Sequence, residues 1–413
     1  MTATTADVAA AVADAHRREW AFVLAATLRV TRDLDVAEEC VQEVFAAALT
    51  DWATAGVPAR PGAWLTTAAR RRALNVLRHR GVERRYLPLL VEEDVAPSMV
   101  DDAHGYPDDR LRLVATCCHP ALDRPAQVAL TLRLVCGLTT GEVARAFLVP
   151  PATMAARITR AKKKIAVARI PYRVPPAAEL PERVDAVLAV VHLLFTTGHT
   201  APAGEELVRR DLVERSVELA RMLRGLLPRD PAVAGLLALL LLTDARRETR
   251  TGDDGRLLLL EEQDRTRWDR AAIAEGVELV REALRARPPS RYALQAAIAA
   301  VHAESPSWDD TDWAEVVALY GVLTQVWPSP VVALNRAVAV GFASGAAAGL
   351  AALDELAAEP QLAGYGYLPA ARADLLRRLG RVGEAREAYG EALSLTENAA
   401  ERAFLDARLR ALG

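Results

Sequence analysis

Residues 138–165 constrain the fold most, because they predict two helices joined by a tight turn. This stretch reads LTTGEVARAFLVPPATMAARITRAKKKI. Thr139 and Glu142 have the spacing of a capping box, in which a hydroxyl and a carboxylate each accept a hydrogen bond from a backbone N–H at a helix start. Pro150 and Pro151 prevent this helix from continuing but suit the first turn of a second helix. Two short helices around such a turn are typical of a helix-turn-helix.

The second predicted helix has two faces of different character. Four apolar residues recur at intervals of four, three and four, which predicts a buried stripe. They are Met154, Ile158, Ala161 and Ile165. One residue earlier, a row of donors and cations repeats the same intervals, and it consists of Thr153, Arg157, Arg160 and Lys164. Such a row suits the phosphates and base edges of a major groove, with a merely solvated basic face as the alternative.

Composition indicates a mostly helical chain with more than one domain. The 413 residues exceed what one hydrophobic core usually serves, so we expect two or three domains. Apolar residues make up 52% of the chain and are rich in Ala and Leu, whereas the alternation typical of β-strands is scarce. No early segment has the form of a secretion signal, and the apolar runs are too short to span a bilayer. We therefore expect a cytoplasmic protein.

The four cysteines raise the question of a zinc site. Cys117 and Cys118 are adjacent, which makes them poor co-ligands, and neither Cys40 nor Cys136 completes a Cys/His pair at a zinc-finger distance. We expect buried thiols that pack as small apolar groups, with no metal and no cofactor.

Charge is distributed in blocks, although the net charge is only -3. Residues 32–51 hold six acidic side chains and one basic one, residues 60–85 one acidic and eight basic, and residues 86–109 seven acidic and none basic. Residues 1–170 carry 23 basic and 19 acidic side chains, against 28 and 35 in the remainder. Neighbouring blocks of alternating sign indicate partners of differing charge.

The first two blocks lie on two further predicted helices. DLDVAEECVQEVFAAALTDW begins with an acidic cap and places apolar side chains on one face, namely Ala37, Val41, Val44, Phe45, Ala48 and Leu49. The other face shows Glu38, Glu39, Gln42 and Glu43, for which solvation is the simplest explanation. After a Pro/Gly loop, AWLTTAARRRALNVLRHRGVERR can pack Leu65, Ala69, Ala73 and Val76 inward, with Arg71, Asn75 and Arg78 outside.

Together and in this order, the motifs of residues 7–170 resemble a bacterial sigma factor of the extracytoplasmic-function group. The resemblance rests on the helix D-x-x-x-A-E-E-x-V-Q-E-V-F, the Trp-Leu start of the arginine-rich helix, the acidic linker, and the helix-turn-helix ending T-x-x-x-R-x-x-R-A-K. The segments TCCHPAL, QVALTLRLVCGLTTGEVARAFLVPPATMAARI, QDRTRWD and LQAAIAAVHAE resemble a subgroup with a tetratricopeptide-like C-terminal extension.

The resemblance implies an all-α fold in four parts. Sigma domain 2 would span residues 1–85, an acidic linker residues 86–109, sigma domain 4 with the helix-turn-helix residues 110–170, and a helical tetratricopeptide-like extension residues 171–413. In the family the linker threads toward the RNA exit path, where its carboxylates could imitate RNA; a solvated linker is the alternative.

The resemblance also implies partners and site residues. Core RNA polymerase would be contacted at its clamp and flap regions, the clamp through Asp35, Glu38, Glu39, Gln42 and Glu43. The -10 promoter element would be melted and held by residues 56–62 and the following helix, through Trp64, Arg70, Arg71, Asn75 and Arg78. Trp64 equally suits a core. Many relatives have Asn and Asp where Arg71 and Asn75 stand, so the preferred -10 bases stay open. The -35 element would be read by Thr153, Arg157, Arg160 and Lys164.

The C-terminal half has features of a helical repeat. RRLGRVGEAREAYGEALSL is close to a tetratricopeptide unit, with Gly380 at the turn and Ala385, Tyr389 and Ala392 at packing positions. Repeat arrays bind peptides or proteins, so we expect a protein partner or docking onto the basic front of the same chain. The segment containing Gln263, Asp264, Arg265 and Trp268 is our candidate for a contact between the halves, with local helix packing as the alternative.

Catalysis is not expected. The carboxylates around residues 253–264 have no accompanying nucleophile or metal-ligand spacing, and His192, His199 and His302 are expected to be structural. The leading prediction is therefore a promoter-specificity subunit. The alternative is a repeat-type interaction protein whose helix-turn-helix binds DNA independently, as in a one-component regulator. Only the first needs the acidic face of residues 35–43.

Overall fold

A computed structural model describes residues 5–79, 109–147, 149–173, 179–201, 203–204, 207–252 and 255–413. In these residues the fold is all-α apart from two strands of two residues each, which confirms the predicted fold class. The chain divides into two compact units, Met1–Val190 and Val191–Gly413. Residues 86–108 of the predicted acidic linker lie outside the described residues.

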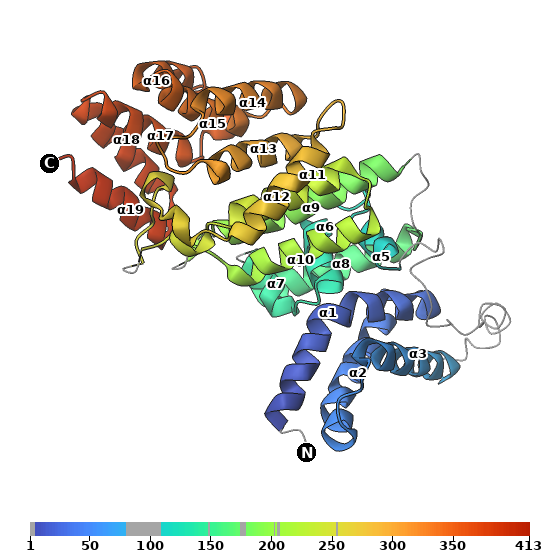
Figure 1. The fold of residues 1–413 in the computed structure, drawn as a ribbon. Coiled ribbons are helices and arrows are strands. Elements are labelled where there is room, and N and C mark those ends of the chain that lie inside the picture. The colour runs from blue at the N-terminus through green and yellow to red at the C-terminus, as the bar shows by residue number, and fades with distance from the viewer. Residues whose placement is uncertain are drawn as a thin grey trace. The chain divides into compact units, whose positions relative to one another are not determined.

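The N-terminal unit begins with three long helices and continues with shorter ones (Figure 1). The long helices are α1 (Thr5–Thr31), α2 (Leu34–Ala55) and α3 (Pro61–His79). The shorter elements are α5 (Asp109–Cys117), α6 (Arg124–Leu130), the π-helical turn η1 (Thr131–Val135), α7 (Thr140–Ala146) and α8 (Pro151–Val167). Helix α9 (Leu180–His199) contains the boundary between the units.

The three long helices pack on one another around a core that contains Trp20, Trp52 and Leu65. The Asp33 side chain caps α2 by accepting hydrogen bonds from the backbone N–H groups of Asp35 and Val36, at 2.9 and 3.1 Å. The predicted apolar stripe of α2 is buried except for Leu49, which is 48% exposed because it lies at the edge of the stripe. Helix α3 starts three residues before Trp64, at a proline that suits a first helical turn.

The predicted helix-turn-helix is confirmed in its details. The Thr139 backbone N–H donates to Glu142 Oε2 at 2.6 Å, and the Glu142 N–H donates to Thr139 Oγ1 at 3.2 Å. Helix α8 begins at Pro151 and packs against α6 and α7. Its four predicted stripe residues are all buried.

The C-terminal unit is an array in which successive helices pack on one another (Figure 1). After strand β1 (Ala203–Gly204), its helices are α10 (Arg210–Leu226), α11 (Pro231–Asp244), α12 (Arg270–Ala283), α13 (Arg291–Glu304), α14 (Trp313–Val326), α15 (Pro330–Ala343), α16 (Ala346–Asp354), α17 (Tyr367–Arg378), α18 (Val382–Leu395) and, after strand β2 (Glu397–Asn398), α19 (Ala399–Arg410). Single 3₁₀ turns are η2 (Arg247–Thr249), η3 (Leu260–Glu262), η4 (Arg265–Arg267) and η5 (Pro360–Leu362).

Residues predicted for a turn and for packing positions lie at the end of this array. Gly380 has a φ of +73° at the turn between α17 and α18, a conformation that glycine adopts without strain. Ala385, Tyr389 and Ala392 are buried on α18. Nearest-neighbour packing of helices is the organisation expected of a repeat array.

The first and last segments of the C-terminal unit are joined. Strands β1 and β2 pair in parallel, with Ala203 opposite Glu397 and Gly204 opposite Asn398. The fully buried Asn398 side chain donates to the Ala201 carbonyl at 3.0 Å and also caps α19. Because this one side chain serves two backbone segments, it fixes the last helix to the start of the unit.

All four cysteines are buried free thiols. The described residues contain no cluster of His, Cys, Asp and Glu that could hold a metal ion. In the same residues, no helix combines the length and the apolar character needed to cross a membrane.

Candidate polymerase and nucleic-acid interfaces

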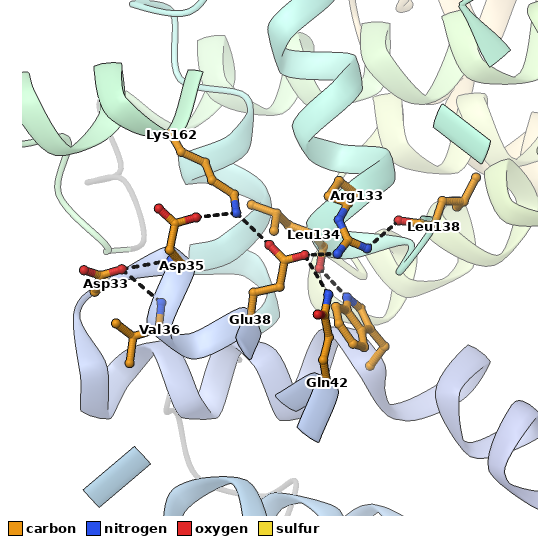
Figure 2. Close-up of polar contacts among 10 residues, drawn as sticks. Asp33, Asp35, Val36, Glu38, Gln42, Arg133, Leu134, Leu138 and Lys162 are labelled. Atoms are coloured by element: carbon orange, nitrogen blue, oxygen red, sulfur yellow. Dashed lines mark hydrogen bonds and ion pairs between the residues drawn. The ribbon is translucent and has the colours of Figure 1, made fainter. Parts of the chain in front are cut away.

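Glu38 of α2 lies at the centre of an ion-pair cluster (Figure 2). Lys162 Nζ of α8 donates to Glu38 Oε2 at 2.7 Å and to Asp35 Oδ1 at 2.6 Å. The Arg133 guanidinium of η1 forms an ion pair with Glu38 and donates to the Leu138 carbonyl at 2.8 Å. We call this group of four residues the Glu38 cluster; it consists of Asp35, Glu38, Arg133 and Lys162. It joins the acidic helix to the helix-turn-helix.

Three of the four side chains in the cluster are shielded from water. The side chains of Glu38, Lys162 and Arg133 are 8, 12 and 13% exposed, whereas Asp35 is 75% exposed. Burial by itself lowers the pKa of Lys162, but Glu38 and Asp35 outweigh it and the pKa lies above its ordinary value. Lys162 therefore stays charged, and removing Glu38 would leave it with the largely exposed Asp35 as its carboxylate partner in the cluster.

Two further contacts fix the same arrangement. The Trp20 indole N–H donates to the Leu134 carbonyl at 3.0 Å, and its ring lies against His16 and Phe45. The Tyr172 hydroxyl, just after the helix-turn-helix, is 3.0 Å from the Ala25 carbonyl and 3.2 Å from that of Asp109. The long-helix bundle and the helix-turn-helix are thus held together by polar and apolar contacts.

Gly137 offers a test of this packing. Its φ is +72°, and an added Cβ would lie 2.9 Å from atoms of His16 and Trp20. We expect Gly137→Ala to lower the free energy of unfolding by about 2–5 kcal/mol, because backbone strain and overpacking add. Gly380→Ala is the control, since Gly380 has a similar φ but open space around it, and should cost only about 1–2 kcal/mol. Equal losses in chemical denaturation would show that the close approach at Gly137 is unimportant.

The other predicted polymerase-binding residues remain at the surface. Glu39, Gln42 and Glu43 are exposed, although Gln42 also donates to Glu38 Oε1 at 3.1 Å. Glu43 accepts hydrogen bonds from Arg72 of α3, which lower its pKa. The expectation that the whole acidic face is solvated was therefore wrong for Glu38.

The predicted -10 residues of α3 are mostly exposed. Arg71, Asn75 and Arg78 reach solvent, Arg78 donates to Asn75 Oδ1 at 3.1 Å, and Arg70 is half-buried. Trp64 is half-buried and packs edge-to-face on Trp52, with ring centroids 5.7 Å apart. This contact supports a packing role for Trp64.

The predicted -35 residues of α8 form an accessible row. Thr153, Arg160 and Lys164 are exposed, and Arg157 is half-buried with its guanidinium 5.4 Å from the Phe147 ring centroid. Because the buried stripe lies beside this row, α8 can keep its packing while the row contacts a ligand.

The interdomain candidates make hydrogen bonds inside the C-terminal unit. Trp268 Nε1 donates to Thr249 Oγ1 at 2.9 Å, and the Gln263 amide donates to the Leu258 carbonyl at 3.1 Å. Arg265 donates to the carbonyls of His302 and Ser305, and Asp264 caps η4. These bonds support the alternative of local helix packing, and a contact between the halves stays a prediction.

Sequence reasoning missed the pairing of Glu38 with Lys162 and Arg133. A signal was present, since Glu38 lies three residues before Val41 and continues the spacing of the buried stripe. Lys162 likewise follows the buried Ile158 by four residues. The pattern could place both at the edge of a buried face, but it could not show that these faces meet.

The structure defines an all-α protein with two basic helices and one acidic helix, and the comparisons identify its family. Residues 16–82 match sigma-70 region 2, residues 112–165 match sigma-70 region 4, and residues 183–284 match a family of unknown function, DUF6596. An uncharacterized protein of Rhizobium meliloti is 42% identical over 392 residues, which cover 94% of this chain and 92% of that protein.

The chain belongs to the sigma-70 family, as an extracytoplasmic-function-like sigma factor with a C-terminal extension. These regions assign it a role in transcription initiation, with RNA polymerase and promoter DNA as partners. They also place it in a family of non-enzymatic transcription factors.

Proposed function

We propose that this chain is an alternative promoter-specificity subunit that reads the -35 element through α8, holds the -10 element through α3, and binds the polymerase clamp through α2. The exposed row of α8 carries the proposal, because its donors and cations stand beside a stripe that is fully used in packing. Such a helix can enter a major groove without losing its own support. The match of residues 112–165 to sigma-70 region 4 supports the proposed contact with the polymerase flap.

The Glu38 cluster adds a condition to polymerase binding. With Glu38 covered by Lys162 and Arg133, region 4 occupies part of the α2 face that the clamp would contact. We infer that this arrangement is a closed state and that region 4 leaves α2 when polymerase binds. When only a fraction of the molecules is in the open state that can bind, the measured affinity for polymerase is lower than that of the open state by that fraction.

The second candidate is a one-component regulator that binds DNA without polymerase. The Glu38 cluster is the observation in favour of this candidate. Asp35 and Glu38 pair with Lys162 of the same chain, so these acidic residues on α2 can be explained without a polymerase contact. Run-off transcription with core polymerase separates the candidates. Promoter-specific transcripts that depend on the chain are expected, whereas tight duplex binding with no specific transcript would reject the sigma-factor proposal.

The α8 row gives a prediction about promoter recognition. Replacing a base-reading arginine, Arg157→Ala or Arg160→Ala, should cost about 1–3 kcal/mol on the cognate promoter and relax preference at one base pair. Lys164→Ala should instead weaken all promoters alike and lower the salt dependence, because it removes a phosphate contact. Affinities of the holoenzyme for a set of single-base promoter variants, at two salt concentrations, measure both effects. Unchanged selectivity in both arginine variants would contradict the assignment.

We propose a regulatory role for the C-terminal unit. Residues 171–413 carry 35 acidic and 28 basic side chains, so their net charge is opposite to that of residues 1–170. Opposite charge supports docking in cis on the basic front, and helical-repeat packing supports a protein partner. Cutting the chain after Arg173 and comparing polymerase binding and promoter activity with those of the full chain is the test. Unchanged values in both assays would leave the unit as an independent scaffold.

A further inference from the structure

A cavity of about 400 Å³ lies in the C-terminal unit among α11, α13, α14 and α15. Its volume is within the range of small-molecule sites. One part of its wall is aliphatic, with Leu239, Leu242, Ile298, Leu323 and Val332. The polar part contains Arg246, Thr243, Gln295, His302, Tyr320 and Asn335, and no acidic residue is among the lining residues that the structure describes.

Arg246 differs from the two arginines that follow it in this part of the chain. Arg247 forms ion pairs with Asp244 and Glu214, and Arg250 donates to the carbonyl of His199 and to Thr200 Oγ1. Arg246 is only partly exposed, yet the described residues offer its guanidinium neither a hydrogen bond nor an ion pair. A shielded cation without a counter-charge is costly unless a ligand supplies one.

The electrostatic environment of the cavity is positive. Burial, followed by the nearby Arg265, lowers the pKa of Arg246 to about 10. Burial, followed by Arg246 and Arg265, lowers the pKa of His302 to about 4, so this imidazole is neutral near pH 7. His302 Nδ1 is buried and has no hydrogen-bond partner in the described structure. Cations and neutral donors around an aliphatic wall favour an amphipathic anion.

We propose that this cavity binds a small organic anion, in which a carboxylate or phosphate group pairs with Arg246 and an apolar body lies against the aliphatic wall. Thr243, Gln295 and Asn335 supply neutral hydrogen-bonding groups around the anion. A second cavity of about 910 Å³ shares Leu239, Thr243, Leu260 and Asn335 with the first, so a longer apolar body extends into it. Binding of this ligand makes the C-terminal unit responsive to a small molecule, through residues that are separate from the proposed promoter contacts.

The test uses the full chain with octanoate and phenyl phosphate as probes, and chloride at equal ionic strength as the reference salt. At saturation, at least one probe should raise the Tm of the wild type by about 5 °C, because a ligand that binds only the folded state stabilises it. The two probes distinguish a carboxylate ligand from a phosphate ligand. Absence of a shift with both probes would overturn the proposal.

Variants of Arg246 decide whether the anion binds where we propose. Arg246→Met should abolish the shift and leave the Tm without probe equal to or above that of the wild type, since it removes an uncompensated cation. Arg281→Met is the matched control, because the Arg281 side chain is 63% exposed and pairs with Glu278; it should keep the shift. Calorimetry on Arg246→Lys, which keeps the charge but not the planar fork, should give about tenfold weaker binding. An Arg246→Met protein that responds like the wild type, or that is less stable than Arg281→Met before probe is added, contradicts the proposal.

Discussion

Lys162→Glu is expected to tighten binding of the chain to core RNA polymerase by about a hundredfold to a thousandfold. The substitution removes the cation from Glu38 and Asp35 and adds a third carboxylate beside them, so α8 is repelled from α2. Breaking a buried ion pair costs about 3–5 kcal/mol, and each 1.4 kcal/mol is about a factor of ten in an equilibrium constant. The whole acidic face of α2 then becomes available without the cost of opening.

Binding to core polymerase in the absence of DNA is the appropriate measurement, because a change on α8 also affects promoter contacts. Lys163→Glu is the matched control: it makes the same charge change one residue away, at an exposed side chain. It should leave the affinity for core polymerase within about twofold, as expected for an exposed residue outside any cluster. If both variants bind like the wild type, or both bind more weakly, the Glu38 cluster does not restrain polymerase binding.

Acid is expected to destabilise the C-terminal unit strongly between pH 6.5 and pH 4. Burial lowers the pKa of His192 and His302 to about 4, and that of His199 also lies well below its ordinary value because of burial. The unfolded chain therefore takes up protons in this window while the folded unit does not. The stability is fully present above about pH 6.5 and is lost as the pH falls toward 4. For His192 and for His302, the lowering of the pKa from 6.5 to about 4 contributes about 3 kcal/mol to the free energy of unfolding.

Hydrogen exchange at pH 7.5, 5.5 and 4.5, corrected for the intrinsic exchange rate, measures this effect separately in each helix. Carboxylates also titrate near pH 4, so the comparison is between wild type and His302→Gln, whose side chain cannot be protonated. The variant should lose about 3 kcal/mol less than the wild type across the window. A parallel pH dependence of the two proteins would show that His302 is not protonated on unfolding.

Local patterns in the sequence predicted the elements well. The capping box at Thr139, the proline start of α8 and the spacing of Met154 and Ile158 all depend on residues within one or two helical turns. Such features are decided by backbone hydrogen bonding and by which face must be buried. The positions of Ala385 and Tyr389 were predictable for the same reason.

Contacts between distant segments could not be predicted in this way. Glu38 and Lys162 are 124 residues apart. In the sequence, each side chain by itself fits a solvated helix face as well as it fits a buried ion pair. The cavity around Arg246 likewise combines Gln295 and His302 of α13 with Asn335 of α15. No single segment reveals that Arg246 has no carboxylate beside it; only the folded arrangement does.

The chain has three lysines, all adjacent, and one of them is held in the Glu38 cluster. Amine-reactive reagents attack accessible, deprotonated ε-amino groups, so the low exposure and raised pKa of Lys162 protect it while region 4 contacts α2. Lys163 and Lys164 are exposed and serve as internal standards on the same peptide. The ratio of modification at these three neighbours reports the fraction of molecules in the open state without any engineered label. Acetylation of Lys162 removes its charge, so a molecule modified while open cannot re-form the ion pair and is trapped in the polymerase-competent form.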